Sequence, residues 1–129
     1  MLDHIGFAVA DAERSRLFYE QALAPLGLAL QMSIAAEDNG SGGAAYGFGT
    51  PNDPFFWIGE NEKVGEGTHV AFRAESRAQV DAFHAAALAA GARDNGAPGI
   101  REKYHPNYYA AFVFDPDGIN LEAVCHASE

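Results

Sequence analysis

Residues 115–124, DPDGINLEAV, decide how the rest of the chain is interpreted. DPDG has the residues of a turn, and INLEAV has the pattern of a strand. Strand side chains alternate between two faces, so Glu122 lies on the face opposite Leu121. A carboxylate inside a sheet is costly unless water, a partner or a metal meets it. We therefore looked for that partner elsewhere in the chain.

Length and composition indicate one globular domain and restrict its partners. The chain has 129 residues, enough for a sizeable core without disulfide support. The single cysteine, Cys125, cannot form an intrachain disulfide, which fits a cytoplasmic location. We expect no signal peptide and no membrane span, because the start lacks a basic and apolar leader and no apolar run reaches about 20 residues. The net charge of −10 argues against nucleic acid or an anionic membrane as partner and leaves a small-molecule substrate open.

The two halves of the chain resemble each other. HIGFAVADAERSRLFYEQAL, which starts at His4, aligns without gaps with HVAFRAESRAQVDAFHAAAL, which starts at His69, 65 residues later. Each segment has a strand pattern followed by a helix pattern. The predicted helix N-caps are Asp11 and Ser76, and the predicted C-terminal stops are Gly27 and Gly91.

Three further strands, separated by turn residues, are predicted after each helix. The turns of the first half are 37–43, EDNGSGG, and 51–53, PND, whereas the poorly patterned segment 93–107 suggests a loop around a weak strand. The chain thus reads as an α+β fold of two βαβββ modules. The predicted strands after the helices are 28–35, 44–50, 54–59, 93–100, 108–114 and 119–126, and the single domain 1–129 divides into modules 1–59 and 67–129 joined by a linker at 60–66.

Alternation places two histidines and a carboxylate on equivalent faces of these modules. His4 and His69 are each followed on their own face by small residues, which leaves room for a cavity, and Glu122 lies on the corresponding face of the last strand. Two imidazoles and one carboxylate form a metal site with open positions for water and substrate. The residue 65 positions before Glu122 is Trp57, whose indole cannot ligate, so three protein ligands are expected, with Trp57 as a wall. The alternative is that both histidines are simply satisfied within their sheets.

The motifs DHIGFAV, GTHVAF and DPDGINLEAV, with the helices between them, resemble the vicinal oxygen chelate superfamily, which includes glyoxalase I, extradiol dioxygenases, and fosfomycin and bleomycin resistance proteins. The resemblance implies paired βαβββ modules curled around a central site. It implies a divalent ion (Fe, Mn, Ni or Zn) held by His4, His69 and Glu122, and a homodimer whose site is built within one chain or across two. Glyoxalase I has a glutamate near the position of Trp57, so the resemblance favours an extradiol-type dioxygenase or another lyase over lactoylglutathione lyase.

The segment 101–109, REKYHPNYY, is a second chemical cluster. His105 is a candidate general acid or base, because an imidazole titrates near neutrality. Tyr108 or Tyr109 is a candidate hydrogen-bond donor to a substrate oxyanion, and Arg101 with Lys103 a candidate holder of a substrate carboxylate. In the alternative interpretation the tyrosines pack the loop, and His105 and the cations are solvated.

Aromatic residues of the first module are candidates for the pocket wall. Phe55 and Trp57 share one strand face, and Tyr46 on the preceding strand is expected to contribute. The sequence therefore favours a metal-dependent enzyme whose small substrate chelates the ion through vicinal oxygens. The alternatives are a metal-free drug-binding protein of the bleomycin-resistance kind, which would use Trp57 and Phe55, and a thiol transferase.

Overall fold

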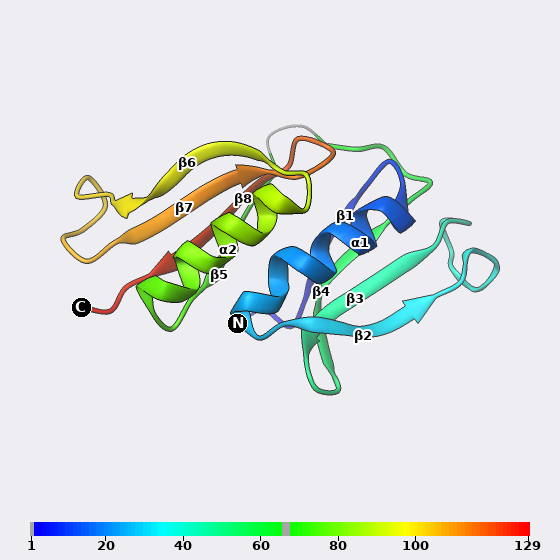
Figure 1. The fold of residues 1–129 in the computed structure, drawn as a ribbon. Helices are drawn as coiled ribbons and strands as arrows, with labels where there is room; N and C mark the ends of the chain where they lie inside the picture. The colour runs from blue at the N-terminus through cyan, green and yellow to red at the C-terminus, as the bar shows by residue number, and fades with distance from the viewer. Residues whose placement is uncertain (1, 66–67) are drawn as a thin grey trace.

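Each half of the chain forms a βαβββ unit in the computed structural model, which describes residues 2–65 and 68–129 (Figure 1). The first unit contains β1 (Ile5–Ala8), α1 (Ala12–Leu23), β2 (Ala29–Ile34), β3 (Ala45–Thr50) and β4 (Asp53–Gly59), with short 3-10 turns at Ala24–Leu26 and Ala36–Asp38. The second contains β5 (His69–Arg73), α2 (Arg77–Ala89), β6 (Arg93–Ile100), β7 (Tyr109–Phe114) and β8 (Asn120–Cys125). The predicted α+β class and the duplicated module are confirmed. Residue 66 of the predicted linker 60–66, and residue 67 at the predicted start of the second module, lie outside the described part of the chain.

The two sheets have the same topology. Their strand orders are β1-β4-β3-β2 and β5-β8-β7-β6, and the first strand of each unit runs parallel to the last. Gly6 pairs with Trp57 in one sheet, and Ala71 pairs with Glu122 in the other. This register confirms that Trp57 occupies the position in its module that Glu122 occupies in the second.

Both helices begin and end as the sequence predicts. The Asp11 side chain accepts the amide N–H of Arg14, and the Ser76 side chain accepts that of Gln79, so each satisfies a free donor of the first helical turn. Gly27, which follows the 3-10 turn after α1, has a φ of 78°, a left-handed conformation that glycine adopts without a Cβ clash.

One face of each sheet packs against the helices, and the other stays open. Figure 1 shows α1 and α2 side by side, each along its own sheet. Along β5, Val70 and Phe72 are buried, whereas His69 and Ala71 are exposed. We call the side of each sheet turned away from its helix the open face. Neither helix in the described part of the chain is long and apolar enough to cross a membrane.

The turn between β7 and β8 fastens the second module to α1. Asp115 is buried; its Oδ1 accepts the amide N–H groups of Asp117 and Ile119, both at 2.8 Å, and its Oδ2 accepts the Tyr19 hydroxyl at 2.7 Å. Asp117 in turn accepts the Arg14 guanidinium at 2.9 Å. The two aspartates of DPDG therefore set the turn and tie the two modules together.

The poorly patterned segment 93–107 divides into two parts. Residues 93–100 form the eight-residue edge strand β6, whose pairing with β7 is interrupted by register shifts between Asp94 and Gly96 and between Gly96 and Gly99. Pro98 is tolerated there, because an edge strand leaves one row of amides unpaired. Residues 101–108 form the loop that leads into β7.

We predict that Tyr19→Phe lowers the free energy of unfolding by about 1–3 kcal/mol at pH 7, because Asp115 Oδ2 keeps its burial and loses its donor. Burial, and then the neighbouring Asp115 charge, raises the pKa of Tyr19 well above its ordinary value. The folded state therefore keeps this proton, whereas the unfolded chain releases it above about pH 10. The contribution of Tyr19 to the free energy of unfolding is thus fully present below about pH 10 and declines above it. Urea unfolding measured from pH 7 to 11 should show that the difference in free energy of unfolding between the parent and Tyr19→Phe becomes smaller as the pH rises.

The exposed Tyr104 provides the control, since Tyr104→Phe should leave stability unchanged across this range. A Tyr19→Phe protein as stable as the parent at pH 7 would contradict the proposed tie between the modules.

Candidate functional site

The carboxylate of Glu122 is buried on the open face of the second sheet. The residue is 2% exposed, in the middle of β8. Its Oε2 accepts the hydroxyl of Tyr108, and its Oε1 lies 3.0 Å from Nε2 of His69. The strand face predicted from alternation thus brings His69 and Glu122 together.

The other nitrogen of His69 determines which atoms hold protons. Nδ1 lies 3.2 Å from the main-chain carbonyl oxygen of Asn120. A carbonyl oxygen has no hydrogen to give, so Nδ1 must be the donor. In neutral His69, Nε2 then turns a lone pair toward a carboxylate oxygen that also carries only lone pairs. The contact therefore requires either a further proton, on the imidazole or on the Glu122 carboxyl group, or a metal ion between the two atoms.

The geometry fits a metal ion. Ligand nitrogen and carboxylate oxygen atoms bind such ions at about 2.0–2.2 Å, so two ligands at right angles stand about 3 Å apart, as these two atoms do. A carbonyl that accepts the far N–H of an imidazole is also the usual way to orient a ligating histidine.

His4 does not join this pair within the chain. Its side chain is 59% exposed, and its Nδ1 contacts Asp3 Oδ1 at 2.8 Å. Across residues 2–65 and 68–129, no three His, Cys, Asp or Glu side chains form a group that could hold a metal ion. Of the two arrangements that the sequence leaves open, the described residues therefore do not form the one in which a single chain brings His4, His69 and Glu122 together. His4 instead borders a cavity of about 260 Å³ on the first module, beside Phe55.

Tyr108 and His105 lie beside Glu122 in a packed aromatic group. Burial, and then the hydrogen bond to Glu122, raises the pKa of Tyr108, so its hydroxyl is a donor at neutral pH. His105 packs on the Tyr108 ring with centroids 5.4 Å apart. Both nitrogens of His105 are engaged: Nδ1 accepts the Asn107 amide at 3.0 Å, and Nε2 lies 2.7 Å from Nδ1 of His126. His105 therefore packs against Tyr108 with both nitrogens hydrogen-bonded, and its role as a general acid or base stays a prediction.

Two tyrosines predicted for the site lie on the helix side of their sheets. The Tyr109 hydroxyl donates to Asp81 of α2 at 2.6 Å. The Tyr46 hydroxyl donates to Glu13 of α1 at 3.2 Å. Tyr109 follows Tyr108 on the chain and so takes the opposite face. Neither residue faces the site, which corrects both expectations.

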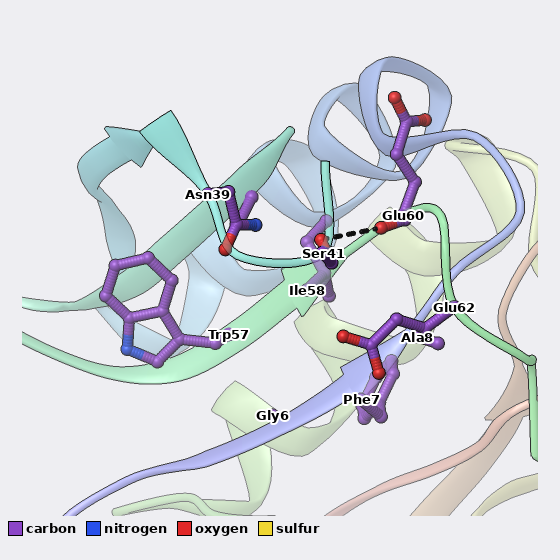
Figure 2. A pocket seen from close by; sticks show the side chains of 11 residues that line it. Gly6, Phe7, Ala8, Asn39, Ser41, Trp57, Ile58, Glu60 and Glu62 are labelled. Atoms are coloured by element: carbon purple, nitrogen blue, oxygen red, sulfur yellow. Dashed lines mark hydrogen bonds between the residues drawn. The ribbon is translucent and has the colours of Figure 1, made fainter. Parts of the chain in front are cut away.

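Trp57 lies on the open face of the first module. Gly6 and Gly47 are its neighbours on the adjacent strands, and a Cβ on Gly47 would come within 2.7 Å of the indole. The two glycines therefore leave the indole room on the sheet. It borders a cavity of about 250 Å³, in which Figure 2 shows the Glu62 carboxylate and the Asn39 side chain. The sequence gives no signal for these two, because they come from connecting segments.

Arg101 and Lys103 line a third cavity, of about 370 Å³, on the open face of the second module. They share it with Phe112, whose ring stacks on His69 with centroids 6.4 Å apart. The predicted substrate cations are thus separated from the His69–Glu122 pair by a single phenyl ring. Phe112 itself was missed, because a phenylalanine in a strand is ordinarily a core residue.

Comparison with known proteins agrees with this architecture. The model of the Glyoxalase/Bleomycin resistance protein/Dioxygenase superfamily matches residues 1–123. A glyoxalase/bleomycin resistance protein from Albidiferax ferrireducens T118 is 30% identical, with a TM-score of 0.70 over 96% of this chain and 97% of that one. Glyoxalase I from Zea mays, at 19% identity, shares the fold with a TM-score of 0.74 over 99% of this chain and 45% of the maize chain. No curated protein matches.

The chain therefore belongs to the glyoxalase/bleomycin resistance protein/dioxygenase superfamily.

We predict that Gly47→Ala displaces the indole of Trp57, since the new Cβ would also approach Pro54 Cβ to 2.9 Å. Overpacking of this kind costs about 1–3 kcal/mol of stability. Trp57 is the only tryptophan, so its emission spectrum reports the displacement directly. Gly40→Ala is the control, because nothing lies within 4 Å of the added Cβ. Identical emission and stability in both variants would show that Gly47 does not seat the indole.

Proposed function

We propose that the protein is a divalent-metal-dependent enzyme that acts on a small molecule through two neighbouring oxygen atoms, with lyase- or dioxygenase-type chemistry. The observation that carries the proposal is the 3.0 Å contact between His69 Nε2 and Glu122 Oε1, with His69 Nδ1 held by a carbonyl. Two lone pairs that converge in this way need a proton or a metal ion between them, and the proposal assigns the metal ion.

We further propose that His4 of a second copy completes the site, in a homodimer. Within its module, His4 stands where His69 stands in the other, and it is exposed on the open face beside Phe55. Placing the first module of one chain over the second module of another would bring His4 toward the His69–Glu122 pair. The maize chain, of which this chain matches 45%, has room for both members of such a pair.

The surrounding residues have distinct roles in the proposed site. Tyr108 holds Glu122 by one oxygen and leaves the other for the ion. Phe112 covers one side of His69, and Trp57 offers an aromatic wall from the first module. The bound ion would supply Lewis acidity, which stabilises negative charge that develops on a substrate oxygen. Because an indole replaces the carboxylate at position 57, we propose three protein ligands, and a chemistry other than that of lactoylglutathione lyase.

A second candidate function rests on the indole alone. Trp57 lies beside a cavity with Asn39 and Glu62, so a planar molecule could stack there without a metal. Drug sequestration of this kind would need neither His69 nor Glu122.

We predict one tightly bound divalent ion per chain when the protein is dialysed against Fe(II), Mn(II), Ni(II) or Zn(II) and analysed for metal. Glu122→Gln and His69→Gln should each lower the affinity by more than 100-fold, and Tyr108→Phe, which only positions Glu122, by about 10–100-fold. His84→Gln is the matched control, because His84 makes a similar contact with Asp94, at 2.9 Å, away from the open face. Equal metal affinity in Glu122→Gln and His84→Gln would refute the ligand assignment.

Mixed dimers test whether the site is shared. Chains with His4→Gln and chains with Glu122→Gln should each bind metal weakly alone. A dimer of one with the other should regain one tight site, because one of its two sites receives both native residues. If ligands came from a single chain, every site in the mixed dimer would carry a defect, and no tight binding would return.

A further inference from the structure

The cavity at the far side of Phe112 carries positive charge that the chain itself leaves uncompensated. The chain has 18 acidic and 8 basic residues, yet no carboxylate of the described residues forms an ion pair with Arg101 or Lys103. The Lys103 ammonium instead lies over the Tyr104 ring, 5.1 Å from its centroid. Lys63, Arg73, Arg77 and Arg93 also form no ion pair with the described residues, so what distinguishes Arg101 is its position in this cavity.

The guanidinium of Arg101 is held in place by its surroundings. Its Cζ lies 5.4 Å from the Phe112 ring centroid, and its Nη2 donates to the carbonyl of Ala97 at 2.7 Å. Beneath it, β6 provides two glycines. A Cβ would come within 3.2 Å of the guanidinium at Gly96 and within 3.0 Å at Gly99, and the φ of 152° at Gly96 also favours glycine.

Only one of the five N–H groups of this guanidinium has an acceptor among the residues that the structure describes. The others can donate into the cavity of about 370 Å³, which Phe112, Tyr104 and Asn120 line. A planar fork of donors between aromatic walls matches a carboxylate on a small apolar body.

We propose that this cavity binds the carboxylate of the substrate, with Arg101 as the residue that determines specificity. The proposal rests on the proposed function and narrows it to organic acids. Phe112 lies within 6.4 Å of the His69 ring and 5.4 Å of the Arg101 Cζ, measured from its ring centroid. Phe112 therefore neighbours both the proposed metal site and Arg101, and the acid presents its two chelating oxygens to the first and its carboxylate to the second.

The experiment uses metal-free protein, so that its outcome is independent of the proposed metal site. Protein stripped with EDTA is titrated with benzoate and followed by amide chemical shifts and calorimetry. We expect saturable binding at millimolar concentrations, with shifts centred on residues 95–104 and 112. Arg101→Gln should weaken binding about ten- to a hundredfold, and Arg101→Lys, which keeps the charge and loses the fork, by less. Benzamide, the neutral isostere, should bind at least about tenfold more weakly than benzoate.

Arg93→Gln is the matched control. The Arg93 guanidinium also stacks on a phenylalanine of β7, with its Cζ 4.9 Å from the Phe114 centroid, but it does not line the cavity. This variant should bind benzoate like the parent, and thermal unfolding confirms that all variants are folded.

Three outcomes would overturn the proposal: no saturable benzoate binding by the parent, equal binding by Arg101→Gln and Arg93→Gln, or tighter binding of phenyl phosphate than of benzoate. A protein that binds no metal would still give the same benzoate-binding results. The carboxylate-site proposal and the metal-site proposal can therefore fail independently.

Discussion

A carboxyl group buried inside a sheet has to be met by hydrogen-bond donors or by a metal ion, and the second module is arranged around that requirement at Glu122. Tyr108 donates to one of its oxygens, and the imidazole of His69 faces the other. Because the Asn120 carbonyl already accepts the far N–H of His69, the contact between this imidazole and Glu122 needs either a further proton, on one of the two groups, or a shared metal ion.

The remainder of the fold positions this pair and leaves it open on one side. Asp115 and Asp117 fasten the second module to α1, so the helices of both modules lie together and the open faces of both sheets stay uncovered. The duplicated modules have diverged at one decisive position. Trp57 lies between two glycines in the first module, where the second places Glu122 between Ala71 and Phe112. One module thus supplies an aromatic wall with one histidine, and the other supplies the pair that needs a further proton or a metal ion. Under the proposed function, the site is complete only when unlike modules meet.

Much of this could be predicted from the sequence, because alternation and capping are local. The repeat, the helix caps and the face of Glu122 all follow from the spacing of residues a few positions apart. Tyr46 and Tyr109 were misplaced because a tyrosine is compatible with either face of a strand, and only the hydroxyl partners on α1 and α2 distinguish them. The contact between His105 and His126 could not be predicted, because His126 follows the end of β8, 21 residues later. The failure of His4 to join the site has a different cause: the relative placement of the two modules depends on long-range contacts such as that of Asp115 with Tyr19.

The most direct test of the central claim is a crystal structure of the metal-loaded protein, with anomalous scattering recorded at the absorption edge of the added ion. The account predicts one anomalous peak bonded to both His69 Nε2 and Glu122 Oε1, with His4 of the partner subunit as the third protein ligand. A crystal grown with excess metal that shows no peak between these two atoms, and leaves them in a simple imidazolium–carboxylate contact, would contradict it.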